Sequence, residues 1–259
     1  MKNPIRGLWI LLFSSLILFI IISYTGVPEI FGYELKKSDF YPQLTSREIL
    51  AKHPDIDTVK TVKVMPKNIE QDTTSKSILF IGDSMLEGLS PRLAAYSKKN
   101  GHTLNTVIWY SSTSEYWGRC DTLAHFIKQF NPNYIFICLG ANELFVKDIK
   151  KKRAVYVDNI LSQIGDIPYL WIGPPNWKED TGINDLLESK LKPGSFFLSD
   201  GMHFDRAKDG AHPTRNSAAL WMDSVGRWMK HNSCHPIKMA LPPEKKARAN
   251  RTIVLQPLK

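Results

Sequence analysis

Three short polar segments contain residue types that could together carry out acyl transfer from an ester. The first, GDSM, places Asp83 and Ser84 directly after an apolar run. The second, GANE, places Asn142 after another apolar run, and the third, DGAHPT, sets Asp209 and His212 three residues apart. A serine that attacks an ester needs an imidazole to take its proton, a carboxylate to orient that imidazole, and donors for the developing oxyanion. The three segments supply one group for each of these tasks.

Each segment also has a simpler interpretation. Asp83 and Ser84 lie where a strand should give way to a helix, and these residue types are common N-caps. An Asp-x-x-His pair in a polar loop is more often solvated than catalytic, and Asn142 alone could be a turn residue. Chemistry is favoured because three strand ends carry the required groups, which helix capping explains poorly.

The elements that must position these groups follow from alternating apolar and helical segments. Short apolar runs predict strands, and amphipathic stretches between them predict helices. The predicted strands are 77–82, 103–110, 133–140, 167–173 and 194–200, and the predicted helices are 90–101, 120–130, 154–165 and one within 214–232. This pattern indicates an α/β fold of three layers with a mostly parallel five-stranded sheet. Ligands bind such sheets at the carboxyl ends of the strands, where the polar segments fall.

Over residues 77–232 the three segments resemble the sequence blocks of the SGNH, or GDSL-type, hydrolases. The resemblance implies a flavodoxin-like sheet and a serine esterase in which Ser84 is the nucleophile, His212 the base and Asp209 the acid. It implies that the N–H of Ser84 and the amide of Asn142 form part of the oxyanion hole. No cofactor is expected, and no spacing of cysteine and histidine indicates a metal site.

The chain departs from the family pattern at two places. The family has a glycine after the second strand, whose backbone N–H donates to the oxyanion, whereas this chain has SSTSEYWG there. Ser112, Thr113 or Ser114 could provide that N–H, and Ser114 is the predicted donor. Glu143 stands where the family usually has aspartate, and only a structural effect is expected from this change.

The Asp-x-x-His spacing occurs twice. In DGMH, Asp200 and His203 are also three residues apart, so either pair could serve the serine. The DGAH pair is favoured because it has the HPT continuation of the family block and directly precedes the closing helix. His203 is then expected to be a polar loop residue or to contact substrate at the mouth of the site.

The N-terminal segment predicts an exported protein. Residues 8–27 form an uncharged stretch long enough to span a bilayer as a helix. The residues that follow match a small-x-small cleavage site poorly, which favours an uncleaved signal anchor over a cleaved signal peptide. Lys2 and Arg6, within residues 1–7, should remain in the cytoplasm, so the catalytic domain is expected on the periplasmic or extracellular side.

Length and composition agree with one globular domain and appendages. The 259 residues are 43% hydrophobic and 23% charged, which suffices for a sizeable core. Spaced prolines over 28–76 predict a spacer. The domain is predicted over residues 77–233, and residues 234–259 are predicted to be a basic tail. The net charge of +9 comes from scattered or terminal residues without a nucleic-acid-binding signature, so no nucleic-acid partner is expected. A solvated face, or attraction to an anionic membrane or glycan, explains the excess charge.

The three cysteines indicate little about the compartment in which the protein works. Cys138 lies inside an apolar run and is expected to be buried. Cys120 and Cys234 could pair in an oxidising compartment, but free thiols are the expectation.

The expected function combines the resemblance with the predicted export. It is removal of O-acyl groups, with acetyl the expected acyl group, from a cell-envelope or extracellular polysaccharide. One alternative is an O-acyltransferase with the same serine, working beside a membrane-bound O-acyltransferase that delivers the acyl group. Another is a binding module with an inactive site. Four aromatic residues after strand ends would suit either a sugar-binding cleft or packing, namely Tyr116, Trp117, Trp171 and Trp177.

Overall fold

The computed structural model describes residues 13, 29–30, 33–34 and 69–257. The chain divides into two units, residues 1–55 and 56–259. In the first unit, β1 (Glu29–Ile30) and β2 (Tyr33–Glu34) pair as antiparallel strands. Apart from Phe13, the predicted signal anchor lies outside the described residues, as do the predicted cytoplasmic N-terminus and most of the predicted spacer. Within the described part of the chain, no helix has the length and apolar character needed to cross a membrane.

The second unit contains a six-stranded parallel sheet in the order β7-β6-β5-β3-β4-β8. The strands are β3 (Ser77–Gly82), β4 (Thr103–Trp109), β5 (Tyr134–Cys138), β6 (Tyr169–Ile172), β7 (Phe196–Phe197) and β8 (Arg251–Leu255). Without β8, the five remaining strands have the flavodoxin-like order 2-1-3-4-5 when they are counted along the chain. The predicted α/β fold is therefore confirmed, but the sheet has six strands rather than five.

The sixth strand comes from the segment predicted as a basic tail. β8 pairs in parallel with β4, from Arg251 opposite Asn105 to Leu255 opposite Trp109. The prediction that residues 234–259 lie outside the domain is therefore wrong. A strand at the sheet edge is only partly covered and needs few apolar residues, so the short run TIVL between basic and polar neighbours did not stand out.

The segment before β3 pairs with residues 236–238. Asp72 N donates to Pro236 O at 2.8 Å, and Lys238 N donates to Asp72 O at 3.0 Å. His102, at the start of β4, accepts a hydrogen bond from Lys76 N at 3.1 Å through Nδ1. The domain therefore extends beyond the predicted boundaries on both sides.

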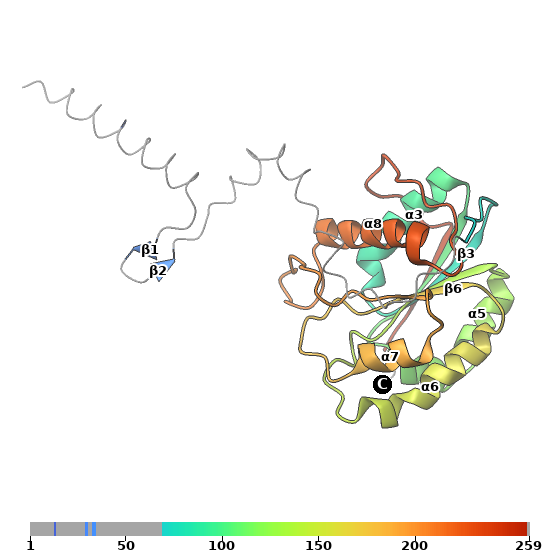
Figure 1. Cartoon of the computed structure of the whole chain (residues 1–259), viewed down its shortest axis with the longest axis horizontal. Coiled ribbons are helices and arrows are strands. Elements are labelled where there is room, and N and C mark those ends of the chain that lie inside the picture. Colours follow the sequence, from blue (N-terminus) through green and yellow to red (C-terminus); the bar gives the residue numbers. More distant parts are fainter. Residues whose placement is uncertain (1–12, 14–28, 31–32, 35–68, 258–259) are drawn as a thin grey trace, which may run out of the picture. The chain divides into compact units, whose positions relative to one another are not determined.

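Helices cover both faces of the sheet. They are α3 (Leu86–Asn100), α4 (Ser114–Gly118), α5 (Thr122–Phe130), α6 (Ile149–Ile164), α7 (Ile183–Lys190) and α8 (Arg215–Asn232). Figure 1 shows α3 and α8 together on one face and α5, α6 and α7 on the other. The sheet is thus the middle of three layers, as predicted.

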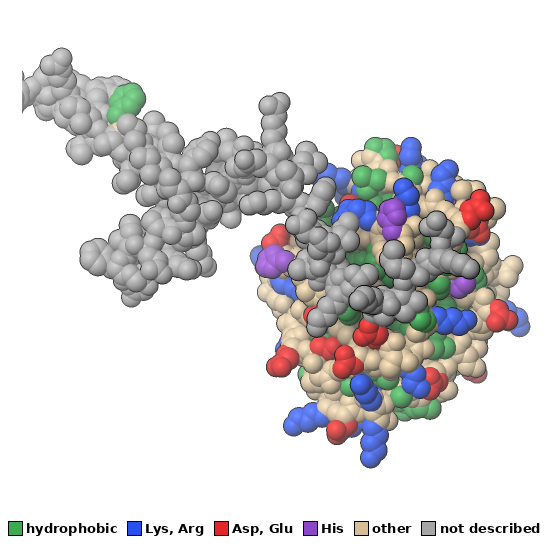
Figure 2. All heavy atoms as spheres, in the orientation of Figure 1, with side chains coloured by type: hydrophobic (Ala, Val, Ile, Leu, Met, Phe, Trp, Pro, Cys, Tyr) green, Lys and Arg blue, Asp and Glu red, His purple; other side chains and the backbone are tan. Residues whose placement is uncertain are grey.

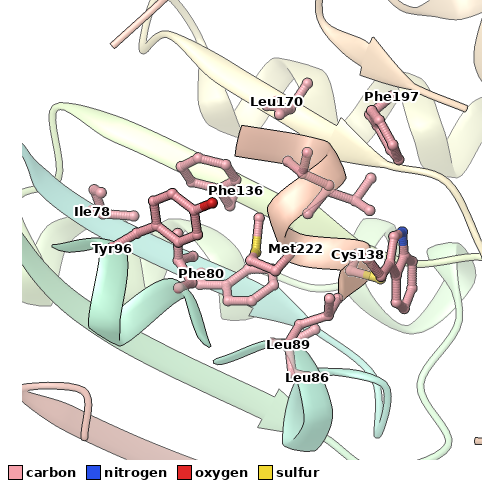
Figure 3. Close-up of a cluster of buried hydrophobic side chains, with 14 of the residues drawn as sticks. Ile78, Phe80, Leu86, Leu89, Tyr96, Phe136, Cys138, Leu170, Phe197 and Met222 are labelled. Carbon is pink, nitrogen blue, oxygen red and sulfur yellow. The ribbon is translucent and has the colours of Figure 1, made fainter. Parts of the chain in front are cut away.

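Two hydrophobic clusters fill the spaces between the layers. Along β3, Ile78 and Phe80 belong to the cluster under α3 and α8, whereas Leu79 and Ile81 belong to the opposite cluster. Figure 3 shows part of the first cluster, in which Met222 of α8 lies among the aromatic side chains of the sheet. Because both faces are buried, the central strands read as continuous apolar runs rather than as alternating patterns.

Charged side chains of both signs and three cysteines lie among the described residues. On the face shown in Figure 2, basic and acidic side chains are interspersed over the described residues rather than gathered by sign. Cys138 is buried in the core, and Cys120 and Cys234 are both free thiols.

Candidate active site

Ser84 lies in the tight turn between β3 and α3. Gly82, at the end of β3, allows close approach to β5, because a Cβ there would lie 2.2 Å from the carbonyl oxygen of Cys138. The N-cap residue of α3 is Met85, and Asp83 rather than Ser84 supports the turn by accepting from Met85 N at 2.9 Å. The Ser84 hydroxyl is therefore not used as a helix cap.

The predicted nucleophile, base and acid are hydrogen-bonded in a chain. His212 Nε2 lies 2.8 Å from Ser84 Oγ, and His212 Nδ1 lies 2.9 Å from Asp209 Oδ2. Asp209 Oδ1 accepts from the backbone N–H groups of Ala211 and His212, each at 2.9 Å. These bonds, with the His212 N–H the largest cause, lower the pKa of Asp209 to about 2. The carboxylate is thus charged at neutral pH and holds the proton on Nδ1, which leaves Nε2 free to accept from the serine.

The loop that carries this pair is a closed hairpin directly before α8. Ala207 N donates to His212 O at 2.8 Å, and Thr214 N donates to Asp205 O at 2.7 Å. Thr214 then caps α8 by accepting from Ser217 N through its side chain. The imidazole is therefore fixed both by its own hairpin and by the start of a buried helix.

A cavity of about 730 Å³ opens over the serine. Besides Ser84, Asp209 and His212, its polar lining comes from Glu87, Tyr110, Ser111, Thr214 and Arg215. The Tyr110 hydroxyl donates to the Glu87 carboxylate. This volume is in the range of small-molecule sites, and the lining offers donors and acceptors for a polar ligand.

Ser114, the predicted oxyanion donor, is occupied elsewhere. Its N–H donates to Glu143 Oε2 at 2.9 Å, and its hydroxyl donates to Glu143 Oε1 at 2.7 Å. The prediction is therefore wrong, because the buried Glu143 carboxylate takes the Ser114 N–H at the start of α4. Glu143 also accepts from Arg153 Nε at 2.8 Å, which gives it the structural role expected for this position.

Asn142 lies between the two turns that follow β3 and β4. Its Nδ2 donates to Ser112 O at 2.9 Å and approaches Asp83 Oδ2 at 3.4 Å. Ser112 N is itself used, since it donates to Trp109 O at 3.1 Å. The amide is thus at the edge of the site, and its role in the oxyanion hole stays a prediction.

Ser111 is a cleft residue that sequence reasoning missed. It is exposed, lines the cavity and has φ +56°, the left-handed conformation that glycine adopts most readily. The missing family glycine was the signal that an unusual backbone position lies in this turn, but the sequence did not show which residue adopts it.

Two buried carboxyl groups lie behind the site. Burial raises the pKa of Asp83 to about 7, and the nearby Glu143 adds to this shift while the bond from Met85 N opposes it. Burial also raises the pKa of Glu143, against the bonds from Ser114 and Arg153. Asp83 is therefore partly protonated at neutral pH, unlike Asp209.

The DGMH pair does not reach the serine. Asp200 Oδ1 accepts from Asn176 Nδ2 at 3.1 Å and from Gly201 N at 3.0 Å. His203 is exposed, and the cavity over Ser84 is lined by the DGAH pair instead. A substrate contact by His203 stays a prediction.

The aromatic candidates separate into two groups. Trp117 and Trp171 are fully buried and pack in the core, so a sugar-binding role for them is wrong. Tyr116 and Trp177 are partly exposed. Among the described residues, no group of three or more potential ligands could hold a metal ion.

The strand order without β8 and the Ser–His–Asp chain at the carboxyl end of the sheet are those that the resemblance to the SGNH-type hydrolases implies. No family profile matches the sequence, and no curated protein matches it. Among solved structures, the chain is similar to a psychrotrophic esterase, EstA, from Pseudoalteromonas sp., with 18% identity, a TM-score of 0.43, and coverage of 60% of this chain and 99% of the other.

Two carbohydrate-related structures show the same level of similarity. A family 3 carbohydrate esterase from Clostridium thermocellum has 15% identity and a TM-score of 0.46, over 61% of this chain and 95% of the other. A two-domain esterase active on acetylated mannans has 13% identity and a TM-score of 0.44, over 60% of this chain and 48% of the other. Because these scores are low, the functional proposal rests on the site itself.

Proposed function

We propose that this protein is a serine esterase that forms an acyl-enzyme at Ser84. The observation that carries this proposal is the hydrogen-bonded chain from Asp209 through His212 to Ser84, at the base of an open cavity. Such a chain activates a serine hydroxyl that is otherwise a weak nucleophile.

The geometry fits a two-step reaction. His212 Nε2 takes the Ser84 proton as Oγ attacks the ester carbonyl, and the imidazolium then gives this proton to the departing alcohol. In the second step His212 takes a proton from water, the hydroxyl attacks the acyl-serine, and the carboxylic acid leaves while Ser84 recovers its proton. Asp209 stays charged throughout and holds the imidazole in the orientation that both transfers need.

We assign the oxyanion hole to the backbone N–H of Ser84 and the amide of Asn142. Ser111 replaces Ser114 as the source of the third donor, through its backbone N–H. Its left-handed conformation at the cavity wall supports this assignment, because that conformation turns a backbone amide in a way that most L-residues avoid.

The proposed substrate is an O-acylated polysaccharide, with acetyl as the acyl group. The polar lining of the cavity supports this choice, since Glu87, Tyr110, Thr214 and Arg215 suit sugar hydroxyls better than a long acyl chain. O-acetyl transfer to a glycan remains the alternative, because the same acyl-serine would serve both reactions.

The location belongs to the same proposal. The uncharged segment 8–27 behind Lys2 and Arg6 supports a single-pass anchor with the catalytic domain outside the cytoplasm. There it would meet envelope or extracellular glycans, and a membrane-bound O-acyltransferase would be a neighbour. Fractionation with membranes and digestion by protease added from the exported side are expected, whereas a mature N-terminus beyond Val27 would indicate secretion.

The test compares the full-length wild type with Ser84→Ala and with Ser224→Ala, a control serine on the exposed side of α8. Acetate release from 4-nitrophenyl acetate and from acetylated xylan should be lost only in Ser84→Ala. A fluorophosphonate should add to Ser84 in wild type, as seen by peptide mass spectrometry. Folded wild type that neither releases acetate nor takes the label contradicts the proposal.

The same assay separates hydrolysis from transfer. Unacetylated oligosaccharide is added as an acceptor, and free acetate should remain the main product. If acetylated oligosaccharide dominates at modest acceptor concentration, the transferase alternative replaces the esterase, with Ser84, Asp209 and His212 in the same roles.

A further inference from the structure

The two sides of the site come from distant parts of the chain. His212 lies in the hairpin before α8, and Asn142 lies in the loop after β5. Between them runs the segment 175–177 after β6, which contributes no group to the proposed chemistry. We propose that Arg206 and Trp177 are positioning residues that bind this segment to both sides and so fix the distance between the base and the oxyanion donors. This inference rests on the proposed function.

Arg206 connects the segment to the histidine side. Its Nη1 donates to Ala211 O at 2.8 Å, and its Nη2 donates to Pro175 O at 2.8 Å and Asn176 O at 3.1 Å. Ala211 directly precedes His212 in the chain. One guanidinium therefore holds the backbone next to the catalytic imidazole against the segment 175–177, with charge-assisted bonds that are stronger than neutral ones.

The surroundings of Arg206 raise the free-energy cost of losing these bonds. The side chain is partly buried, and this burial lowers the pKa of its guanidinium. It also lies 5.1 Å from the centre of the Phe204 ring. The three carbonyl groups that it satisfies would lose their donors if the side chain were shortened, which is costly where water reaches poorly.

Trp177 connects the same segment to the asparagine side. Its Nε1 donates to Ala141 O at 2.9 Å, and Ala141 is buried and directly precedes Asn142. The indole packs against both hydrophobic clusters of the domain, and Phe145 meets it edge-on at 6.5 Å between ring centres. The ring is therefore fixed in place, and its N–H holds the loop that carries Asn142.

Further bonds hold the segment itself. Asn176 donates to Asp200 Oδ1 at 3.1 Å and accepts from Asn184 Nδ2 of α7 at 3.3 Å. The carboxylate of the DGMH motif thus supports the segment rather than the serine. Asp200 lies in the same loop as His212, whereas Asn184 lies in α7, so the segment also has an anchor outside both loops.

The expected effect is on turnover rather than on substrate affinity. His212 Nε2 lies at hydrogen-bond distance from Ser84 Oγ, and a displacement of about 1 Å in such a site can lower the rate by about 10²-fold. Neither Arg206 nor Trp177 lines the cavity over Ser84, so their loss should change KM little.

The Arg206 test uses Arg206→Gln, Arg206→Lys, Arg206→Ala for rescue by guanidinium, and the control Arg119→Gln, whose side chain is exposed at the C-terminal end of α4. With 4-nitrophenyl acetate, kcat should fall about 30- to 100-fold in Arg206→Gln with KM within about threefold of wild type. Arg206→Lys should recover part of the loss. Millimolar guanidinium should restore part of kcat to Arg206→Ala but leave Arg119→Gln unchanged, which a merely structural role does not predict.

The Trp177 test uses Trp177→Phe, which keeps the ring and removes the donor. The control is Trp228→Phe, whose ring packs edge-on against Phe197. A fall in kcat of about 5- to 10-fold is expected for Trp177→Phe alone. The Arg206→Gln/Trp177→Phe double variant should lose less than the product of the two single effects, because both act through one segment.

Failure of this inference differs from failure of the proposed function. If wild type is active and takes the fluorophosphonate label, but folded Arg206→Gln and Trp177→Phe keep kcat within twofold, the positioning role is wrong. If Arg206→Gln does not fold, the comparison of Trp177→Phe with Trp228→Phe decides. Wild type that is inactive and unlabelled contradicts the esterase proposal instead.

Discussion

The loop between β7 and α8 contains the same Asp-x-x-His spacing twice, and the structure treats the two copies differently. Asp209 and His212 are hydrogen-bonded to one another, and the imidazole reaches Ser84 at 2.8 Å. Asp200, nine residues earlier in the sequence, is instead bonded to Asn176 from the loop after β6, and His203 is exposed. Residue types and spacing are therefore insufficient to form a catalytic pair.

The difference comes from the backbone around each aspartate. Asp209 uses Oδ1 for two backbone N–H groups and keeps Oδ2 for the His212 ring. Asp200 uses one oxygen, Oδ1, for both Gly201 N and the Asn176 amide. A closed hairpin surrounds only the second pair, since Ala207 N donates to His212 O. A local turn thus orients the carboxylate, and the hairpin then directs the imidazole to the serine.

Removing each histidine gives the largest expected contrast. His212→Ala should lower kcat for 4-nitrophenyl acetate by about 10⁴-fold or more, because proton transfer from Ser84 is lost. His203→Ala should keep kcat within about threefold and change only KM, if anything, for acetylated polysaccharide. The reverse ranking would transfer the catalytic role to the DGMH pair and break the comparison.

Removing each carboxylate tests the orientation of the ring. Asp209→Asn should lower kcat by about 10³-fold, since an amide no longer stabilises the imidazolium or selects its tautomer. Asp200→Asn should lower kcat less than tenfold, through Asn176 alone. The kcat of both variants is measured by steady-state kinetics, and circular dichroism confirms that they fold. Equal losses would mean that the two motifs share one role.

Asn142 sharpens the comparison by separating proton transfer from oxyanion stabilisation. Asn142→Ala should lower kcat by about 10²- to 10³-fold, the range for loss of one oxyanion donor. The loss should be smaller than in His212→Ala and should leave fluorophosphonate labelling of Ser84 detectable. A loss below tenfold would remove Asn142 from the oxyanion hole.

Replacing Asp83 gives the smallest expected effect. Its pKa is raised, whereas the pKa of Asp209 is lowered, so the two groups change the free energy of unfolding with pH in opposite directions. The pKa of Asp83 is raised from 3.8 to about 7 by burial, so the folded state binds more protons than the unfolded state between these values. The contribution of Asp83 to the free energy of unfolding should therefore fall as pH rises from about 4 through 7, and stay lower above 7. Asp83→Asn should flatten this dependence and be more stable at pH 8 by on the order of 1–2 kcal/mol.

Urea unfolding at pH 5 and pH 8 checks this expectation, with Asp200→Asn as the matched control. That control should keep the wild-type dependence on pH. If Asp83→Asn shows the wild-type dependence as well, the Asp83 carboxyl does not carry the shift, and Glu143 is the next group to replace.

Much of the fold could be predicted, because the strands buried on both faces are continuous apolar runs. β8 could not be predicted, because an edge strand is covered on few sides and needs few apolar residues. Ser114 was predicted wrongly as a donor for a different reason. The Glu143 side chain that occupies its N–H lies 29 residues away in sequence, and no local pattern records that contact.

By itself, the sequence determined where the five predicted strands lie along the chain and which residues stand at their carboxyl ends, because burial and turn formation depend on neighbours within a few residues. Ser84, Asn142 and the Asp209–His212 pair were therefore identifiable. Only the tertiary structure decided which Asp-x-x-His pair reaches Ser84 and which backbone carbonyls Arg206 and Trp177 bind. Those two side chains bind backbone carbonyls, and every residue has a carbonyl, so the sequence gives no sign of which one a distant donor will meet.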